Sequence, residues 1–285
     1  MKKALKIILW TFVSLVVLLF ASGSIFMYKV RNGFPVSFET EAPALEIPAD
    51  KHAVLLFSKS TGFRHEASIE AGKAKFRELA KKNNWFLYDT EEGGVFNPSQ
   101  LEKFDVVIFN NSTGRVLNDE QQKALEDYVN NGGNLIGIHG SGDNSHHWDW
   151  YEQNLMGAHF SHHPLDPQLQ LAEITLNPVG DSTLAAGLPA KWSHSDEWYV
   201  FQQNPRDKGF SILYTIDGEA INPNGNILWM KGMDFGMGKD HPVAWYHDAG
   251  KGRTFYTSIG HDPSAWQKEA FITMMEHASS RGANR

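Results

Sequence analysis

Short apolar runs alternate with helical patterns in the first half of the chain that follows residue 52. The runs are continuously apolar, which is typical of strands buried on both faces, and they cover residues 53–57, 85–88, 105–109 and 134–138. Helical spacing covers residues 66–82 and 119–131, and the second of these helices has Asn118 as a predicted cap with Gln121 three residues later. This alternation predicts a parallel sheet covered by helices.

The pattern loosens after Gly140 into polar stretches rich in His and Trp, and regular elements resume only near residue 210. Further strands are predicted at residues 211–216, 227–231, 243–246 and 253–258, followed by a helix at residues 264–278. We therefore expect one α/β domain with an elaborated second half.

The N-terminus contains an apolar segment of membrane-spanning length. Ile7 to Tyr28 is a run of 22 residues without a charge, and at about 1.5 Å per residue it spans roughly the 30 Å hydrocarbon layer. A signal peptide has a shorter apolar region, so an uncleaved anchor is favoured over Ala21-Ser22-Gly23 as a cleavage site. Three lysines precede the run, which predicts a single-pass inner-membrane protein whose body is periplasmic.

These features divide the chain into four parts. The predicted parts are an anchor at residues 1–31, an extended linker at 32–50, a domain at 51–280 and a tail at 281–285. The linker assignment rests on its three prolines and its few periodic apolar residues.

Composition excludes several classes of function. The chain has a net charge of -7, and no acidic residue lies in its first 32 positions, so the body is strongly acidic and should repel nucleic-acid backbones. The absence of cysteine excludes disulfides, thiolate metal sites and a cysteine nucleophile. Oligomeric state is not indicated by the sequence.

Polar side chains follow several predicted strands, where doubly wound sheets bind their ligands. His65, His139 and His261 each come shortly after an apolar run. His139 is the central residue between Gly137 and Ser141, small residues of the kind that a sharp strand-to-helix elbow requires. Imidazole suits proton transfer or metal ligation near neutral pH.

Five segments in the same order resemble the ThuA-like trehalose-utilisation family. They are Thr61-Gly62-Phe63-Arg64-His65, residues 132–139, Ser195-Asp196-Glu197-Trp198-Tyr199, residues 242–245, and residues 252–261. The resemblance extends from His52 to Ala278. It implies a flavodoxin-like, class I glutamine amidotransferase-like fold, which is a mostly parallel sheet with helices on both faces, behind a transmembrane helix. It also implies a carbohydrate pocket lined by these histidines and Glu197.

Glutamine hydrolysis is excluded because His139 occupies the place of the amidotransferase cysteine and no thiol exists. Ser141 lacks the small-residue frame of a nucleophile. His139, His261 and Glu197 are therefore the predicted catalytic residues of an isomerase, lyase or hydrolase that acts on a sugar or keto-sugar. Either acid/base chemistry or a divalent metal such as zinc fits them, with His65 at the third strand end. His163 resembles a further family position and is added to the predicted metal ligands.

Five residues are predicted to bind substrate: His65, Arg64, Trp148, Trp198 and His241. The two tryptophans lie in polar loops, where an aromatic face can stack on a pyranose ring. Two other hypotheses remain open from sequence. One is a non-catalytic carbohydrate-binding module, and the other is a structural subunit of an envelope complex.

Overall fold

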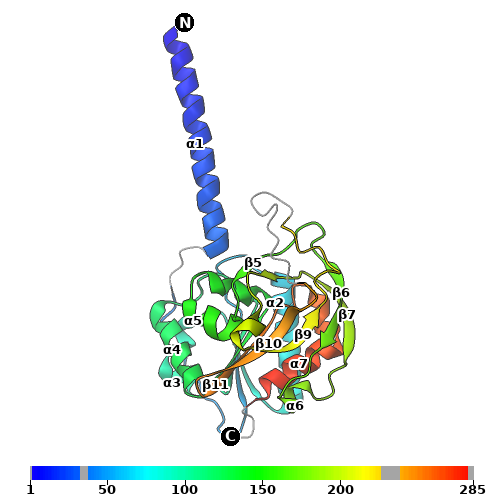
Figure 1. Ribbon diagram of the computed structural model, residues 1–285. Coiled ribbons are helices and arrows are strands. Elements are labelled where there is room, and N and C mark those ends of the chain that lie inside the picture. The colour runs from blue at the N-terminus through cyan, green and yellow to red at the C-terminus, as the bar shows by residue number, and fades with distance from the viewer. Residues whose placement is uncertain (1, 33–37, 226–237, 282–285) are drawn as a thin grey trace.

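A computed structural model of the protein describes residues 2–32, 38–225 and 238–281. Helix α1 (Lys2–Asn32) stands apart from the body (Figure 1). Its segment Lys2–Lys29 is long and apolar enough to cross a membrane, and none of its most apolar stretch is buried by the rest of the chain. An exposed apolar helix of this kind is characteristic of a membrane anchor or of a signal sequence.

The body is built on one mixed sheet of nine strands in the order β2-β1-β3-β4-β11-β10-β9-β6-β7. The first five strands in this order are parallel, and antiparallel pairing begins between β11 and β10. The parallel strands are β1 (Ala53–Phe57), β2 (Phe86–Thr90), β3 (Val106–Asn110), β4 (Asn134–Ile138) and β11 (Gly252–Thr257). The antiparallel strands are β6 (Gln170–Leu176), β7 (Lys191–Asp196), β9 (Ser211–Ile216) and β10 (His241–Ala249). A separate pair joins β5 (Phe160–His162) to β8 (Val200–Phe201).

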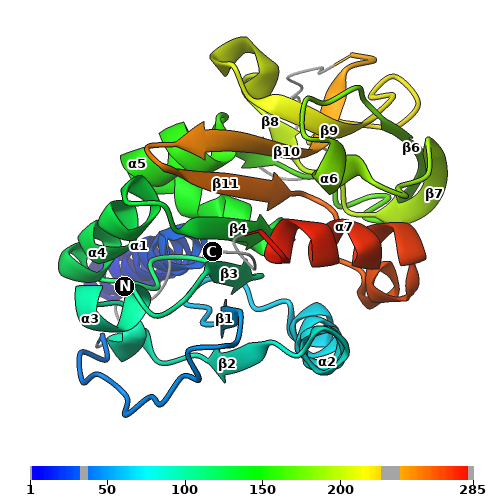
Figure 2. The same ribbon diagram turned by 90° about the horizontal axis from the view of Figure 1, so that it is seen from below.

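Helices cover both faces of the sheet, as predicted (Figure 2). The α-helices of the body are α2 (Glu66–Asn83), α3 (Pro98–Leu101), α4 (Asp119–Asn130), α5 (Asp149–Tyr151), α6 (Ser182–Ala185) and α7 (Glu269–Ser279). Short 3-10 turns are η1 (Gly93–Val95), η2 (His139–His146), η4 (Pro205–Lys208) and η6 (Pro263–Gln267), and η3 (Glu152–Met156) is a π-helix.

Alternate residues of each central strand enter two separate hydrophobic clusters. In β1, Val54 and Leu56 pack with Phe76 of α2 and with α7, whereas Leu55 packs on the opposite face with Leu125 of α4. This two-sided burial explains why the parallel strands are continuously apolar in sequence.

The predicted cap of α4 is confirmed, and the predicted C-terminal helix is confirmed only in part. Asn118 accepts from the backbone N–H of Gln121, and the Gln121 side chain accepts in return from the Asn118 N–H. The helix predicted at residues 264–278 is instead the turn η6 followed by α7, because Asp262 and Pro263 start a tighter turn. The predicted strand at residues 227–231 lies outside the described residues.

The predicted linker packs against the body where the structure describes it. We call residues 38–47 the strap. The Glu39 carboxylate forms an ion pair with Lys59 and accepts from the Gly93 N–H at 3.1 Å. The Gln121 side chain donates to the Glu39 carbonyl oxygen at 2.6 Å, and Leu45 packs on the core farther along. The strap therefore belongs structurally to the folded domain.

A partly buried ion pair between Asp181 and Arg253, near α6, gives a stability prediction. Burial alone would raise the pKa of Asp181, but hydrogen bonds from Thr183, Leu184 and Arg253 lower it to about 2. Since its ordinary value is 3.8, the carboxylate stabilises the fold above about pH 4, and this contribution is lost as pH falls toward 2.

We expect Asp181→Asn to lower the free energy of unfolding by about 2 kcal/mol at pH 7, following 1.4 kcal/mol per pKa unit. The difference from wild type should shrink as the pH falls from 4 to 2, because the wild-type carboxyl then becomes protonated. Urea unfolding at several pH values measures this. A difference that stays constant over that range would contradict the assignment.

Candidate functional site

Four side chains from separate parts of the chain meet at the carboxyl ends of the parallel strands. His65 lies between β1 and α2, His139 directly follows β4, and His261 follows β11. Glu197 comes from the antiparallel half, directly after β7. Each residue offers one ligand atom, and all four atoms lie within 4.8 Å of one another. We call these four residues the His/Glu cluster; it unites His65 with the three predicted catalytic residues.

Three of the ligand atoms have the spacing of a metal site. The His139 Nε2 and His261 Nδ1 atoms lie 3.4 and 3.2 Å from Glu197 Oε2, and 3.3 Å from each other. Zinc bonds of about 2.0 Å at tetrahedral angles place neighbouring ligand atoms about 3.3 Å apart. The donor set of imidazoles and a carboxylate is also one that zinc accepts. The His/Glu cluster can therefore hold a divalent metal.

The elbow after β4 fixes the orientation of His139. Its backbone has φ of 40°, in the left-handed region that side chains other than glycine rarely adopt, so the turn holds it under strain. A Cβ on Gly137 would lie only 2.9 Å from Ser141 Oγ, which explains the need for glycine there. His139 Nδ1 donates to the Ser258 carbonyl oxygen at 2.7 Å, and this leaves Nε2 facing the cluster.

Glu197 is held as a carboxylate although it is almost fully buried. Burial alone would raise its pKa, but interactions with His139, His163 and His261 lower it well below its usual range. His163 Nδ1 lies 3.0 Å from Oε1, and Gln168 donates to the same oxygen at 2.7 Å. The Oε1 atom is thus held by His163 and Gln168, which lie outside the cluster, while Oε2 faces the two cluster imidazoles.

Asp196 ties the two halves of the site together. Its buried carboxylate accepts backbone N–H groups from four residues: Glu197 at 2.9 Å, Gly260 at 2.7 Å, His261 at 3.1 Å and Asp262 at 3.1 Å. Charge-assisted bonds of this kind are stronger than neutral ones. Asp196 is therefore a positioning residue that sets the loop after β11 against the end of β7.

The imidazoles differ in their tendency to take up a proton. Burial, reinforced by the neighbouring histidines, lowers the pKa of His65 well below its usual value, so its nitrogens stay available to a metal near neutral pH. Burial would lower the pKa of His163 and His261 too, but Glu197 outweighs burial and raises both. His163 and His261 are also partly exposed, with side-chain accessibilities of 25% and 18%.

Gly140 makes room for His65. A Cβ at residue 140 would lie 2.8 Å from His65 Nδ1 and 2.9 Å from Thr113 Cγ2. We expect Gly140→Ala to displace His65 and to weaken zinc binding about tenfold. This is the lower end of the 10- to 100-fold loss of metal affinity that follows when residues supporting the ligands are changed. Zinc titration against a competing chelator measures this.

Gly180→Ala is the matched control, because a Cβ there meets no atom within 4 Å. It should bind zinc as the wild type does. If Gly140→Ala also binds zinc with wild-type affinity, His65 is not a ligand.

The other predicted site residues lie outside the His/Glu cluster. His163 contacts Glu197 from the outer side and is not in the four-residue group. Arg64 forms two hydrogen bonds with Glu91 and an ion pair with Glu66, so it braces the ends of β1 and β2. His241 is buried and donates to the Tyr199 carbonyl oxygen at 2.9 Å, and burial lowers its pKa to about 4.

Both tryptophans predicted to stack on sugar are part of the core. Trp198 is fully buried and donates to the Gln170 carbonyl oxygen at 2.7 Å. Trp148 is nearly buried, stacks on Tyr151 and donates to Glu126. Neither offers a free face to a ligand, which removes the support for a binding module built on them.

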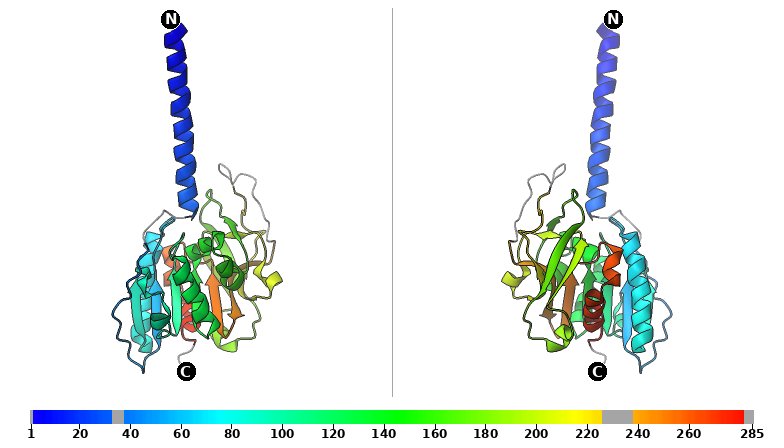
Figure 3. Two further views of the ribbon diagram at one scale, coloured as in Figure 1. Left: turned by 90° about the vertical axis from the view of Figure 1, so that its left-hand side faces the viewer. Right: turned by 90° about the vertical axis from the view of Figure 1, so that its right-hand side faces the viewer.

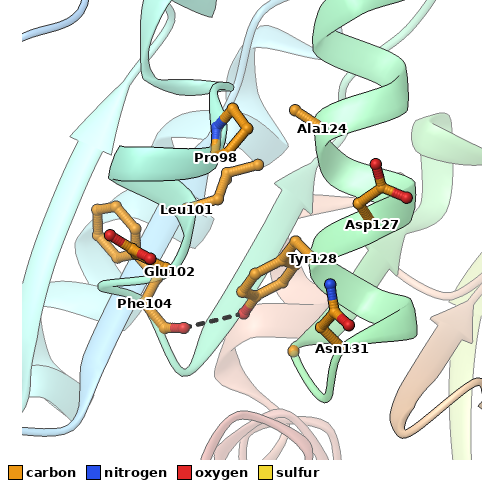
Figure 4. Close-up of a pocket in the computed structure, with 9 residues that line it drawn as sticks. Pro98, Leu101, Glu102, Phe104, Ala124, Asp127, Tyr128 and Asn131 are labelled. Atoms are coloured by element: carbon orange, nitrogen blue, oxygen red, sulfur yellow. Dashed lines mark hydrogen bonds between the residues drawn. The ribbon is translucent and has the colours of Figure 1, made fainter.

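A separate hollow lies between α3 and α4 (Figure 4). Tyr128 donates to the Phe104 carbonyl oxygen at 3.2 Å within it, and Gly133 lines it beside the start of β4. It therefore lies at the amino ends of β3 and β4, opposite His139.

Comparison with known proteins agrees with this architecture. Residues 53–280 match the family described as ThuA, trehalose utilisation. The chain belongs to the ThuA family. Among curated proteins, none matches this sequence.

Solved structures support the ThuA fold. A ThuA-like protein from Bacteroides uniformis aligns with a TM-score of 0.66 at 20% identity, covering 86% of this chain and 94% of that one. A ThuA-like protein from Parabacteroides merdae aligns with a TM-score of 0.59 at 18% identity, covering 82% and 90%. At these identities the likeness establishes the fold alone.

Two contributors to this ThuA site carry little signal in the sequence. Asp196 lies in one of the resembling segments, but its role depends on backbone groups more than sixty residues away. Gln168 lies in the loosely patterned stretch and contacts Glu197 and, at 3.4 Å, His261 Nε2. A search for polar residues next to Glu197 in sequence would find only Asp196.

Proposed function

We propose that this ThuA-family protein is a membrane-anchored enzyme of carbohydrate metabolism that performs metal-assisted chemistry on a sugar or keto-sugar. The observation that supports this most is the spacing of His139, His261 and Glu197 around one point, with His65 beside them. The family description, trehalose utilisation, supports the substrate class.

The chain's own groups have distinct parts in this proposal. His65, His139, His261 and Glu197 would hold the metal, and zinc held there would supply Lewis-acid polarisation of a substrate oxygen. His163 stays outside this set and is partly exposed, so it exchanges a proton with the substrate. Gln168 orients the Glu197 carboxylate and lies at the same exposed side.

The anchor sets the compartment in this proposal. Helix α1 crosses the inner membrane, and Lys2, Lys3 and Lys6 remain in the cytoplasm according to the positive-inside rule. The body with its His/Glu cluster is then periplasmic.

The test combines metal analysis with a panel of sugars and keto-sugars. We expect about one zinc per chain and turnover of at least one panel member, with both lost in His139→Ala and Glu197→Gln. Glu152→Gln is the matched control, since Glu152 also pairs with a histidine, His159, at 2.7 Å but is outside the cluster.

Wild-type turnover that persists after complete zinc removal would replace the metal-assisted mechanism by acid/base chemistry of the same residues. Turnover unchanged in both cluster variants would overturn the assignment of the site.

A further inference from the structure

The strap docks at the edge of the sheet that carries the His/Glu cluster. Lys59, its ion-pair partner, follows the carboxyl end of β1, and Gly93 follows that of β2. The Phe38 ring lies under the Lys59 ammonium at 5.9 Å and the Arg115 guanidinium at 5.6 Å. The first described residues after α1 are thus fixed to the carboxyl ends of the parallel strands, where the His/Glu cluster lies. We call this end of the sheet the catalytic edge.

Covalent reach keeps this edge near the end of α1. Only five residues separate Asn32 from Phe38. An extended chain covers at most about 3.6 Å per residue, so over the six steps from Asn32 to Phe38 the two residues are no more than about 22 Å apart. Figure 1 shows α1 at the same end of the body as β5, which leads into His163, and Figure 3 shows α1 extending from that end in two further views. If α1 spans the bilayer, the catalytic edge lies close to the membrane surface.

Two exposed apolar side chains lie next to residues that belong to the site or contact it. Outside α1, the large hydrophobic residues that are exposed in the described part of the chain are Phe63, Leu169 and Leu171. Phe63 is 59% exposed, and its ring centroid lies 4.9 Å from that of His65. Leu169 is 40% exposed and adjoins Gln168, which contacts Glu197. We call Phe63 and Leu169 the apolar rim.

We propose that the apolar rim contacts the bilayer and that the substrate is a carbohydrate carried on a membrane lipid. This rests on the proposed function for both the anchor and the sugar. Apolar side chains at a membrane surface are stabilised by insertion among headgroups and acyl chains. The body is acidic overall, so this contact depends on apolar burial and not on attraction to anionic lipid.

The geometry also explains why the site would take a lipid-borne sugar. The rim residues adjoin the side at which His163 and His261 are partly exposed. A headgroup that projects from the bilayer reaches these imidazoles directly, while its lipid tails stay in the bilayer that the apolar rim contacts.

The absence of cysteine makes the orientation measurable with single labels. Full-length Phe63→Cys and Lys251→Cys variants, each with one fluorophore, are reconstituted into phosphatidylcholine vesicles that contain a headgroup-attached nitroxide quencher. Lys251 is the matched control, because it is exposed in the turn between β10 and β11, at the opposite edge of the sheet. We expect loss of most fluorescence at position 63 and none at position 251. Equal quenching at the two positions would overturn the inference, whatever the sugar results are.

The substrate class is tested with the same labelled Phe63→Cys protein. Glucosyl-diacylglycerol in quencher-free vesicles should shift the emission of the label, while dissolved methyl glucoside at the same total concentration should not. A shift as large with methyl glucoside overturns the lipid-borne substrate and leaves the carbohydrate function intact. If neither sugar shifts the emission of the label and no member of the turnover panel is converted, the carbohydrate function itself is overturned.

Discussion

Zinc affinity should fall by at least about 100-fold in Glu197→Gln. Changing a residue that only supports a metal ligand lowers metal affinity 10- to 100-fold, and replacing a ligand itself should lower it by at least the upper value. The Oε2 atom lies 3.2 and 3.4 Å from two imidazole nitrogens, and a neutral amide there would leave the metal without its carboxylate. The amide would also give His163 a weaker partner at the other position.

Chelator competition monitored by a zinc indicator measures this affinity, and near-ultraviolet circular dichroism verifies the fold. The Glu152→Gln control should retain wild-type affinity, since its histidine partner lies outside the His/Glu cluster. Equal zinc affinity in wild type and Glu197→Gln would mean that the metal, if bound, is elsewhere.

Asp196→Asn should be the most destabilising single substitution that we consider, with a loss of about 3 kcal/mol, in the range for breaking buried charge-assisted hydrogen bonds. Four backbone N–H groups converge on this fully buried carboxylate. An amide in its place keeps one acceptor oxygen and turns an NH₂ group toward donors.

Urea unfolding followed by tryptophan fluorescence measures the loss. Asp248→Asn is the control: Asp248 also pairs with a cation, Arg253, but its side chain is 66% exposed, and we expect a change within about 0.5 kcal/mol. If the two variants unfold at the same urea concentration, the convergence on Asp196 does not stabilise the fold.

The parallel half of the fold was predictable because its signal is local. Each of β1, β3 and β4 is a short run of apolar residues buried on both faces, and the residue that follows β4 is His139. Parallel strands have their carboxyl ends at one edge, so residues such as His139 and His261 were expected to meet.

The antiparallel half was harder to predict. Strands β6 and β7 alternate between buried and exposed residues and contain polar side chains even at buried positions, such as His194 and Asp196, so they resemble polar loops in sequence. Glu197 was placed in the site by family resemblance and not by periodicity. Trp148 and Trp198 were misplaced for the same reason, since polar neighbours in sequence concealed their burial.

The order of the strands has a consequence for biosynthesis. Strand β11 is the last strand in the described part of the chain, yet it lies at the centre of the sheet between β4 and β10. The parallel and antiparallel halves cannot join until the ribosome has delivered almost the entire polypeptide. Until then β4 and β10 lack the strand that joins them, so the complete sheet forms only when synthesis is nearly finished.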